Sequence, residues 1–306
     1  MKCAGCGGFT RGRAVSMIAR CPHCGRVACF DPRVEPLSDV GFERAVSAVS
    51  GEGSLRWTID QLYYTVGRGV RRRRPVHRLA RRKTVSIQRA DFDRLLVRWQ
   101  GLGLPLEGRI DDVLPQRSSS DLDADIAGLA IDRAVICDHS QMAEFLLANR
   151  FHVEHRCIIL SEDGHPAGAF STAMELLRRS QDLTVVALHD ADPGGCGLER
   201  RLRGGPDWFA GQVTAGRARV VDVGLRPRSA ARYRGSLRAA RPDGTATPEL
   251  SEWELRWLGR YRMEVAALPP RLLLAALPSA WSEASSATED DGVWMWPQPE
   301  SDEDYG

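Results

Sequence analysis

The middle of the chain alternates between short apolar segments and amphipathic segments, and this alternation limits the folds open to it. Four apolar segments are predicted to be strands: Arg133–Cys137, Arg156–Leu160, Leu183–Leu188 and Arg217–Val223. Helical patterns separate them, at Gln141–Asn149, at Ala169–Arg179 and after Gly195. Strands that alternate with helices in this way form a parallel sheet with right-handed crossovers. We therefore predict an α/β domain over residues 126–275, with a late amphipathic helix at Leu250–Leu268.

Two aspartates follow the third predicted strand directly, within the sequence HDADPGG that begins at His189. Asp190 and Asp192 would lie at the carboxyl edge of the sheet, where parallel sheets place their functional groups. Asp138 ends the first predicted strand at the same edge. Carboxylate oxygens are the ligands that Mg²⁺ prefers, so the three acids predict a magnesium site. Turn formation by the pair and helix capping by Asp138 are the alternatives.

Four cysteines near the N-terminus have the spacing of a zinc site. Cys3 and Cys6 form one C-x-x-C pair, Cys21 and Cys24 form a second, and fourteen residues separate the pairs. Two such pairs can surround one tetrahedral Zn²⁺. We predict a zinc-ribbon-like module over residues 1–33 in which the ion is structural. Cys29 is expected to be a buried apolar thiol.

Residues 40–115 combine helical patterns with a basic connection. The helical patterns are Gly41–Val49, Trp57–Val66 and Arg89–Trp99, and Thr84–Ile87 is a possible short strand. This order predicts a mainly α-helical, winged-helix type of DNA-binding domain. The polar segment Gln116–Asp125 is predicted to be a linker to the α/β domain.

Positive charge is concentrated in one block although the whole chain carries a net charge of only +2. Twelve basic and two acidic residues lie between Gly67 and Arg98. The candidate DNA-binding side chains in it are Arg68, Arg71, Arg72, Arg73, Arg74, Arg78, Arg81, Arg82 and Lys83. Such a block binds duplex phosphates through counterion release, and arginine adds bidentate contacts. A solvated arginine-rich loop is the alternative.

The ends of the chain bear on its location. No apolar run is long enough to cross a bilayer, and the N-terminus lacks the apolar core of a secretory signal. We therefore expect a cytoplasmic, nucleoid-associated protein without a membrane partner. Residues 281–306 are predicted to be an acidic disordered tail.

HDADPGG resembles the DxDPxG motif of the Toprim domain in the A subunit of topoisomerase VI and its relatives, the meiotic double-strand-break transesterases. The segment IILSEDGHPAG at Ile158–Gly168 is similar to the strand and Gly-x-Pro turn that precede this motif in the family. The segment TIDQLYY at Thr58–Tyr64 is similar to the family's tyrosine helix, which belongs to a winged-helix domain upstream. The resemblance covers roughly residues 40–270.

The resemblance implies Mg²⁺-dependent transesterification of duplex DNA. In that reaction Tyr64 is the nucleophile, and Asp138 stands where the family has a metal-binding glutamate. A homodimer is implied, because in the family the tyrosine of one protomer works with the Toprim acids of the other. The chain has no P-loop, so ATP-driven strand passage would need a separate ATPase subunit.

Two other functions stay open. A Toprim metal site without an active tyrosine would make the protein a hydrolytic DNA nuclease, of the kind found in bacterial plasmid-defence systems. Asp60 favours this alternative, because the family has an arginine at that position. The third possibility is a catalytically silent DNA-binding scaffold, which the departures at Asp60 and Asp138 both allow.

Overall fold

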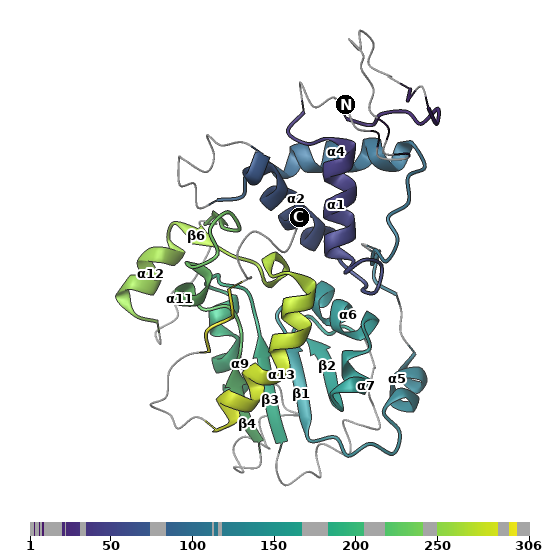
Figure 1. Cartoon of the computed structure of the whole chain (residues 1–306). Coiled ribbons are helices and arrows are strands. Elements are labelled where there is room, and N and C mark those ends of the chain that lie inside the picture. Colours follow the sequence, from purple (N-terminus) through teal and green to yellow (C-terminus); the bar gives the residue numbers. More distant parts are fainter. Residues whose placement is uncertain are drawn as a thin grey trace.

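The computed structural model has three parts: a cysteine module, a helical unit and a parallel-sheet domain (Figure 1). It describes residues 3, 6, 8, 20, 21, 23–30, 35–73, 84–111, 113–115, 118–166, 183–204, 218–240, 250–286 and 294–298. The helical unit lies over one edge of the sheet in Figure 1, and this edge is the one that carries the candidate site.

The sheet domain contains the four predicted strands, and all four are confirmed. They are β1 (Arg133–Cys137), β2 (Cys157–Ser161), β3 (Leu183–Leu188) and β4 (Ala218–Asp222). The order is β2-β1-β3-β4, and every neighbouring pair is parallel. Strands β1, β2 and β3 are almost continuously buried, as expected of a parallel sheet that is covered on both faces, whereas the edge strand β4 buries only Val220 and Val221. Because Cys137 pairs with both Ser161 and Leu188, the residues that follow these strands meet at one edge.

Helices connect and cover the strands. They are α6 (Ser140–Ala148), α7 (Phe151–Glu154), α9 (Leu198–Gly204), α11 (Pro227–Ala230) and α13 (Pro270–Ser286), and a short 3₁₀ helix, η1 (Gly195–Gly197), precedes α9. Helix α6 packs on β1 and β2, whereas α9 and α13 contact β4, and α13 crosses in front of the sheet in Figure 1. The predicted helix Ala169–Arg179 lies outside the described residues. None of the described helices has the length and apolar character needed to cross a membrane.

The helical unit contains α1 (Asp39–Val49), α2 (Ile59–Arg73) and α4 (Arg89–Gly101). Helices α1 and α4 are close to their predictions, whereas α2 continues seven residues beyond the predicted end at Val66, into the segment predicted to be a basic connection. Phe30, Phe42 and Trp99 form an aromatic cluster at its core, with ring centroids 4.7 to 5.7 Å apart. Thr84 makes only an isolated bridge, and its partner is Leu237 of the sheet domain. The described residues therefore contain no strand of a wing at 84–87, and the winged-helix assignment stays a prediction.

Two predicted segments differ from the structure. The linker at Gln116–Asp125 contains a short helix, α5 (Ser119–Asp125), because Ser118 caps its first turn. The predicted helix Leu250–Leu268 is wrong beyond its first half. Helix α12 (Glu252–Leu258) ends at Gly259, and β6 (Tyr261–Arg262) and η2 (Val265–Ala267) follow.

The chain leaves the helical path after Gly259 because long-range pairing replaces the helical hydrogen bonds. Strand β6 pairs with β5 (Arg238–Ala239), and Met263 exchanges backbone hydrogen bonds with Ala191. Ala191 lies on the turn at residues 189–195 after β3, which is called the metal turn after its predicted role. Residues 259–268, which were predicted to be helical, therefore pack against the turn that carries the candidate site.

The C-terminal segment is also more ordered than predicted. Trp281 is a buried residue of α13, and Trp296 is fully buried against the sheet domain. The Trp296 indole donates to the Val223 carbonyl oxygen at 3.0 Å, and its backbone N–H donates to Ser229 Oγ at 3.1 Å. The tail boundary at residue 281 is therefore wrong, because apolar burial outweighs the acidic composition here. Residues 287–293 and 299–306 lie outside the described part.

Candidate active site

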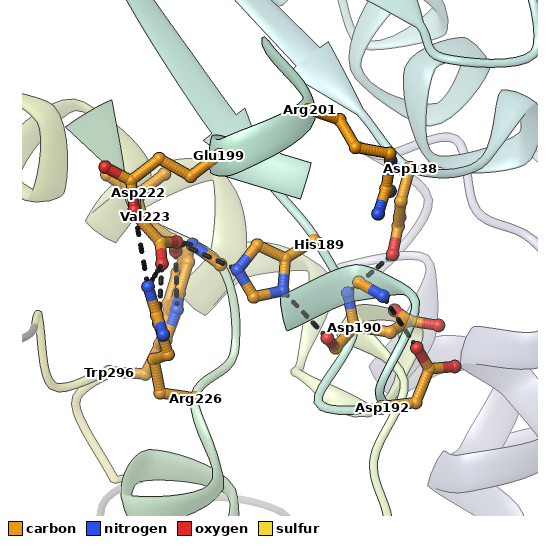
Figure 2. Close-up of polar contacts among 12 residues, drawn as sticks. Asp138, His189, Asp190, Asp192, Glu199, Arg201, Asp222, Val223, Arg226 and Trp296 are labelled. Carbon is orange, nitrogen blue, oxygen red and sulfur yellow. Dashed lines mark hydrogen bonds and ion pairs between the residues drawn. The ribbon is translucent and has the colours of Figure 1, made fainter. Parts of the chain in front are cut away.

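Two of the predicted acids meet at the carboxyl edge of the sheet, and a histidine joins them. Asp138 and His139 follow β1, and Asp190 follows β3. One potential ligand atom from each of the three lies within 4.8 Å of the others. Figure 2 shows the Asp138 carboxylate directed at the backbone of Asp190. The structure thus brings Asp138 and Asp190 together, as predicted from strand order.

Backbone N–H groups hold both carboxylates in place. Asp190 N donates to Asp138 Oδ2 at 2.6 Å, and Val265 N donates to Asp190 Oδ1 at 2.7 Å. Each carboxylate thereby has one oxygen fixed by an amide, and the second oxygen of Asp190 faces His139 Nε2 at 3.5 Å. Hard oxygen donors of this kind suit Mg²⁺, so the residues present fit the predicted ion.

The electrostatics of the cluster also fit a divalent cation. Burial and the neighbouring Asp190 carboxylate raise the pKa of Asp138 to about 7. The Asp190 carboxylate, 3.5 Å from His139 Nε2, raises the pKa of His139 to about 9. Two carboxylates held this close repel each other, and a bound cation relieves that repulsion. His139 was not predicted from the sequence, although its position directly after Asp138 at a strand end was a usable signal.

Asp192 lies on the same turn but outside this group of three. Its Oδ1 accepts the Gly195 N–H at 2.8 Å, which closes the turn into η1. Gly195 is required there, because a Cβ at this position would lie 2.3 Å from the Asp190 carbonyl oxygen. The structure therefore shows Asp192 as a turn-forming residue, and its role as a metal ligand stays a prediction.

An arginine lies beside the acids and was not predicted from the sequence. Arg201 on α9 donates from Nη1 to the Gly194 carbonyl oxygen at 2.8 Å and from Nη2 to Glu162 Oε2 at 2.7 Å. Hydrogen bonding to Glu162 raises the pKa of Arg201, and Asp138 and Asp192 add to the effect. In the view of Figure 2 the Arg201 side chain extends toward Asp138. A phosphate that approached the acids would therefore meet a fixed cation.

The candidate nucleophile Tyr64 is fully buried on α2. Its ring packs edge-on against Tyr63 at a centroid distance of 5.1 Å. Its hydroxyl is buried and makes no well-formed hydrogen bond within the described residues. Burial and the nearby Glu264 carboxylate raise the pKa of Tyr64 well above 10. In this arrangement the phenol is neutral and out of reach of a DNA phosphate.

Helix α2 nevertheless lies next to the metal turn of the same chain. It packs on η2, and Arg68 Nη1 donates to the Ala267 carbonyl oxygen at 2.8 Å. Glu264, which lies near Tyr64, directly precedes Val265, whose N–H holds Asp190. Tyrosine and acids are therefore neighbours, separated by the segment around residue 264.

The described part of the basic block makes contacts within the protein. Arg68 also donates to Thr65 Oγ1 at 2.9 Å, and Arg71 donates to the Arg234 carbonyl oxygen at 2.6 Å. Asp60, the departure from the family pattern, pairs with Arg89. The side chains of Arg72, Arg73, Arg74, Arg78, Arg81, Arg82 and Lys83 lie outside the described residues, so DNA binding by this block stays a prediction.

The four predicted zinc ligands converge at the N-terminus. All four Sγ atoms lie within 4.8 Å of one another. The Cys3–Cys24 and Cys6–Cys21 sulfur distances are 3.6 and 3.7 Å. A tetrahedron with Zn–S bonds of about 2.3 Å has edges of about 3.8 Å, so the cluster fits Zn²⁺. Backbone N–H groups of Cys24 and His23 lower the pKa of Cys21 to about 6, whereas desolvation and the neighbouring thiols raise the pKa of Cys6 to about 11, so Cys21 is the first of the two to ionise.

The cysteine module is fixed to the helical unit through Asp39. Its carboxylate accepts the backbone N–H groups of Cys29 and Phe30 at 2.9 and 2.8 Å. Because Phe30 enters the aromatic cluster around Trp99, the module and the helices share one core.

We expect the purified protein to carry one zinc ion per chain and Cys21→Ser to lose it, because three thiolates hold the ion far less tightly than four. Zinc content by mass spectrometry of the metal measures this. Cys29→Ala is the matched control, since Cys29 is outside the cluster, and it should keep the ion. Equal zinc content in wild type and Cys21→Ser would contradict the assignment.

The comparison with family models agrees with the site geometry. Residues 134–207 match the model described as the topoisomerase 6 A-subunit/Spo11 Toprim domain. The matched segment runs from β1 to α9 and contains Asp138, Asp190 and Asp192, whereas Tyr64 lies outside it. No curated protein matches the chain at a significant level.

Proposed function

Because residues 134–207 form a Toprim domain of the topoisomerase 6 A-subunit/Spo11 family, we propose that the protein is a metal-dependent enzyme that cleaves duplex DNA by hydrolysis. The family implies a DNA-cleaving role, and the fit of the two carboxylates to Mg²⁺ supports it. The observation that favours hydrolysis over tyrosine transesterification is the complete burial of Tyr64.

Each residue at the acidic site has its own role in this proposal. Asp138 and Asp190 would hold Mg²⁺, and the bound ion would neutralise charge on the scissile phosphate and polarise it. Arg201 would contact a phosphate oxygen, since it is fixed beside the acids and is 42% exposed. His139 is 63% exposed, so DNA that reaches the cluster can contact it. Water from solvent replaces the tyrosine as the attacking group.

The family also implies DNA binding, and the partner is proposed to be duplex DNA held in part by the basic block. The described residues hold one such acidic cluster, which would cut one strand, so a double-strand break would require two copies of the chain. A homodimer is therefore part of the proposal, and a separate ATPase subunit stays a prediction.

Tyrosine transesterification is the second candidate, because α2 and the metal turn are neighbours in one chain. Its chemistry needs an exposed phenolate beside the scissile phosphate. Helix α2 would therefore have to leave η2 during the reaction, or its tyrosine would have to act on the acids of a second copy.

Tyr64→Phe is expected to retain Mg²⁺-dependent cleavage of plasmid DNA within about twofold. The change removes a buried hydroxyl that lacks a well-formed hydrogen bond, so the free energy of unfolding should stay equal or rise by up to about 1 kcal/mol. Tyr63→Phe is the matched control for stability, since the Tyr63 hydroxyl donates to the Ile87 carbonyl oxygen at 3.0 Å. It should lose about 1 kcal/mol.

The product ends provide the second measurement. Hydrolysis leaves DNA ends that enter a gel without proteinase treatment, whereas transesterification leaves ends linked to protein. Loss of cleavage in folded Tyr64→Phe, together with protein-linked ends in wild type, would establish the second candidate instead.

A further inference from the structure

His189, the first residue of the metal turn, has a buried ring with an oxygen at each nitrogen. The side chain is fully buried. Nδ1 lies 2.8 Å from the Asp190 carbonyl oxygen, and Nε2 lies 2.9 Å from Asp222 Oδ1 (Figure 2). A carbonyl oxygen can only accept, so Nδ1 must donate. A carboxylate also accepts, so Nε2 donates as well, and the ring carries both protons.

The hydrogen-bond donors around Asp222 show that its carboxylate is ionised. Its Oδ1 accepts the Gly224 N–H at 2.9 Å in addition to the His189 ring, and its Oδ2 accepts from Arg226 Nε at 2.6 Å. Arg226 reaches Glu199 at 3.4 Å. Positive and negative side chains alternate along this row, which consists of His189, Asp222, Arg226 and Glu199. The negative charge of Asp222 therefore compensates the buried imidazolium inside the domain.

The surrounding backbone is shaped around the ring. A Cβ on Gly224 would lie 2.2 Å from the His189 ring, so only glycine allows the chain to pass there. The Leu225 N–H donates to the His189 carbonyl oxygen at 2.8 Å, and Trp296 Nε1 donates to the Val223 carbonyl oxygen. These contacts fix the strand end that carries Asp222 relative to the turn that carries Asp190.

The His189 ring contacts the main chain of Asp190 and not its carboxylate, so His189 is not a ligand candidate. Fixing the Asp190 carbonyl instead fixes the peptide from which the carboxylate extends. Three hydrogen bonds then determine the orientation of Asp190: His189 to its carbonyl, Val265 to its Oδ1, and its own N–H to Asp138.

We propose that His189 and Asp222 are positioning residues that hold the metal turn in its cation-binding conformation through the Asp190 carbonyl. The proposal rests on the function proposed above only in taking Asp138 and Asp190 as cation ligands. Outer groups that orient metal ligands typically change metal affinity about 10- to 100-fold when removed.

Mn²⁺ binding, followed by electron paramagnetic resonance of the free ion, tests the pair on the whole chain without DNA. His189→Gln is expected to raise the Mn²⁺ dissociation constant about 10- to 100-fold, because both donors of glutamine are on one nitrogen and cannot take the places of the two ring nitrogens. Asp222→Asn keeps the size of the side chain and should give a similar loss. The double variant should lose little more than either single variant, because both changes break one chain of hydrogen bonds.

Glu199→Gln is the matched control, since it changes the far end of the charged row and leaves Asp222 with three donors. It should change the dissociation constant less than twofold. Circular dichroism selects variants that retain the fold, and Asp222→Asn serves if His189→Gln does not. In wild type, nitrogen-15 spectra of the imidazole should show directly bonded protons on both ring nitrogens of His189, a signature that packing alone does not require.

Two results would overturn the proposal: unchanged Mn²⁺ affinity in the folded variants, or wild-type protein that binds no Mn²⁺. Protein that binds Mn²⁺ as expected, responds to the variants and cleaves no DNA would overturn the nuclease function and leave the positioning role supported.

Discussion

Asp190→Asn should abolish metal-dependent DNA cleavage while leaving the fold intact. The asparagine Oδ1 can still accept the Val265 N–H, which holds Asp190 at 2.7 Å, so the turn keeps its anchor. The charge that attracts the cation is lost, and Asp138 remains as a single carboxylate. A bound metal ion contributes several kcal/mol to transition-state stabilisation, so cleavage should fall about 1,000-fold or more. Plasmid cleavage at fixed Mg²⁺ concentration measures the loss.

The same variant should gain stability relative to wild type as the pH rises. The folded-state pKa of Asp138 is raised to about 7 from its ordinary value of 3.8. Between these two values the folded wild type holds a proton that the unfolded chain has lost, so its stability falls with rising pH. Asp190→Asn removes the neighbouring charge, and this fall becomes smaller.

The loss of the His139–Asp190 pair changes the stability difference between Asp190→Asn and wild type in the same direction. Its pKa is raised to about 9 by Asp190, so the pair stabilises the folded wild type below the ordinary value of 6.5 and loses this effect as the pH rises through 9. The variant lacks the pair at every pH. The free energy of unfolding of Asp190→Asn minus that of wild type should therefore increase from pH 4 to pH 9, reaching a gain of about 1 kcal/mol at the upper end.

Asp132→Asn is the control for both measurements. Asp132 precedes β1 at the opposite edge of the sheet, and its side chain is 59% exposed. Cleavage and the pH profile should match those of wild type. If Asp190→Asn cleaves DNA at a tenth of the wild-type rate or faster, Asp190 is not an essential metal ligand in the cleavage reaction.

The parts predicted correctly depend on local pattern. Strands buried on both faces give continuous apolar runs such as Leu183–Leu188, and strand order then places Asp138 beside Asp190. The two C-x-x-C pairs predicted the thiolate cluster because ligand spacing is itself a short-range property. Each of these signals lies within about twenty residues of sequence, apart from the pairing of the strands.

The parts that could not be predicted depend on contacts between distant segments. The burial of Tyr64 depends on packing against residues near Glu264, two hundred positions away in sequence. The sequence alone does not distinguish whether His189 is a metal ligand, a surface residue or a buried cation. Its role depends on the contact with Asp222 and on the space that Gly224 leaves for the ring. Arg201 is one of many arginines until α9 directs it toward Glu162.

The second large expected effect is a loss of stability on changing the C-terminal segment, whose acidic composition had predicted disorder. Trp296 stands near an acidic end of the chain, yet it is among the largest side chains that the fold buries completely. Trp296→Ala should lower the free energy of unfolding by about 3–5 kcal/mol, the cost typical of removing a buried tryptophan. The loss includes the hydrogen bond to the Val223 carbonyl oxygen, which would be left without its indole donor.

For a chain of this size the expected change in melting temperature is about 10 °C, followed by circular dichroism with zinc present. Met295→Ala is the matched control one residue away, since Met295 is 38% exposed, and it should cost less than about 0.5 kcal/mol. Deletion of residues 294–306 should cost more than Trp296→Ala, because it also removes the ring of Trp294 beside Trp296 and the hydrogen bonds made by the Pro297 carbonyl oxygen and the Gln298 amide. If Trp296→Ala melts with wild type, the segment is not docked in solution, and the support it gives to Val223 and the neighbouring Asp222 must come from the sheet domain alone.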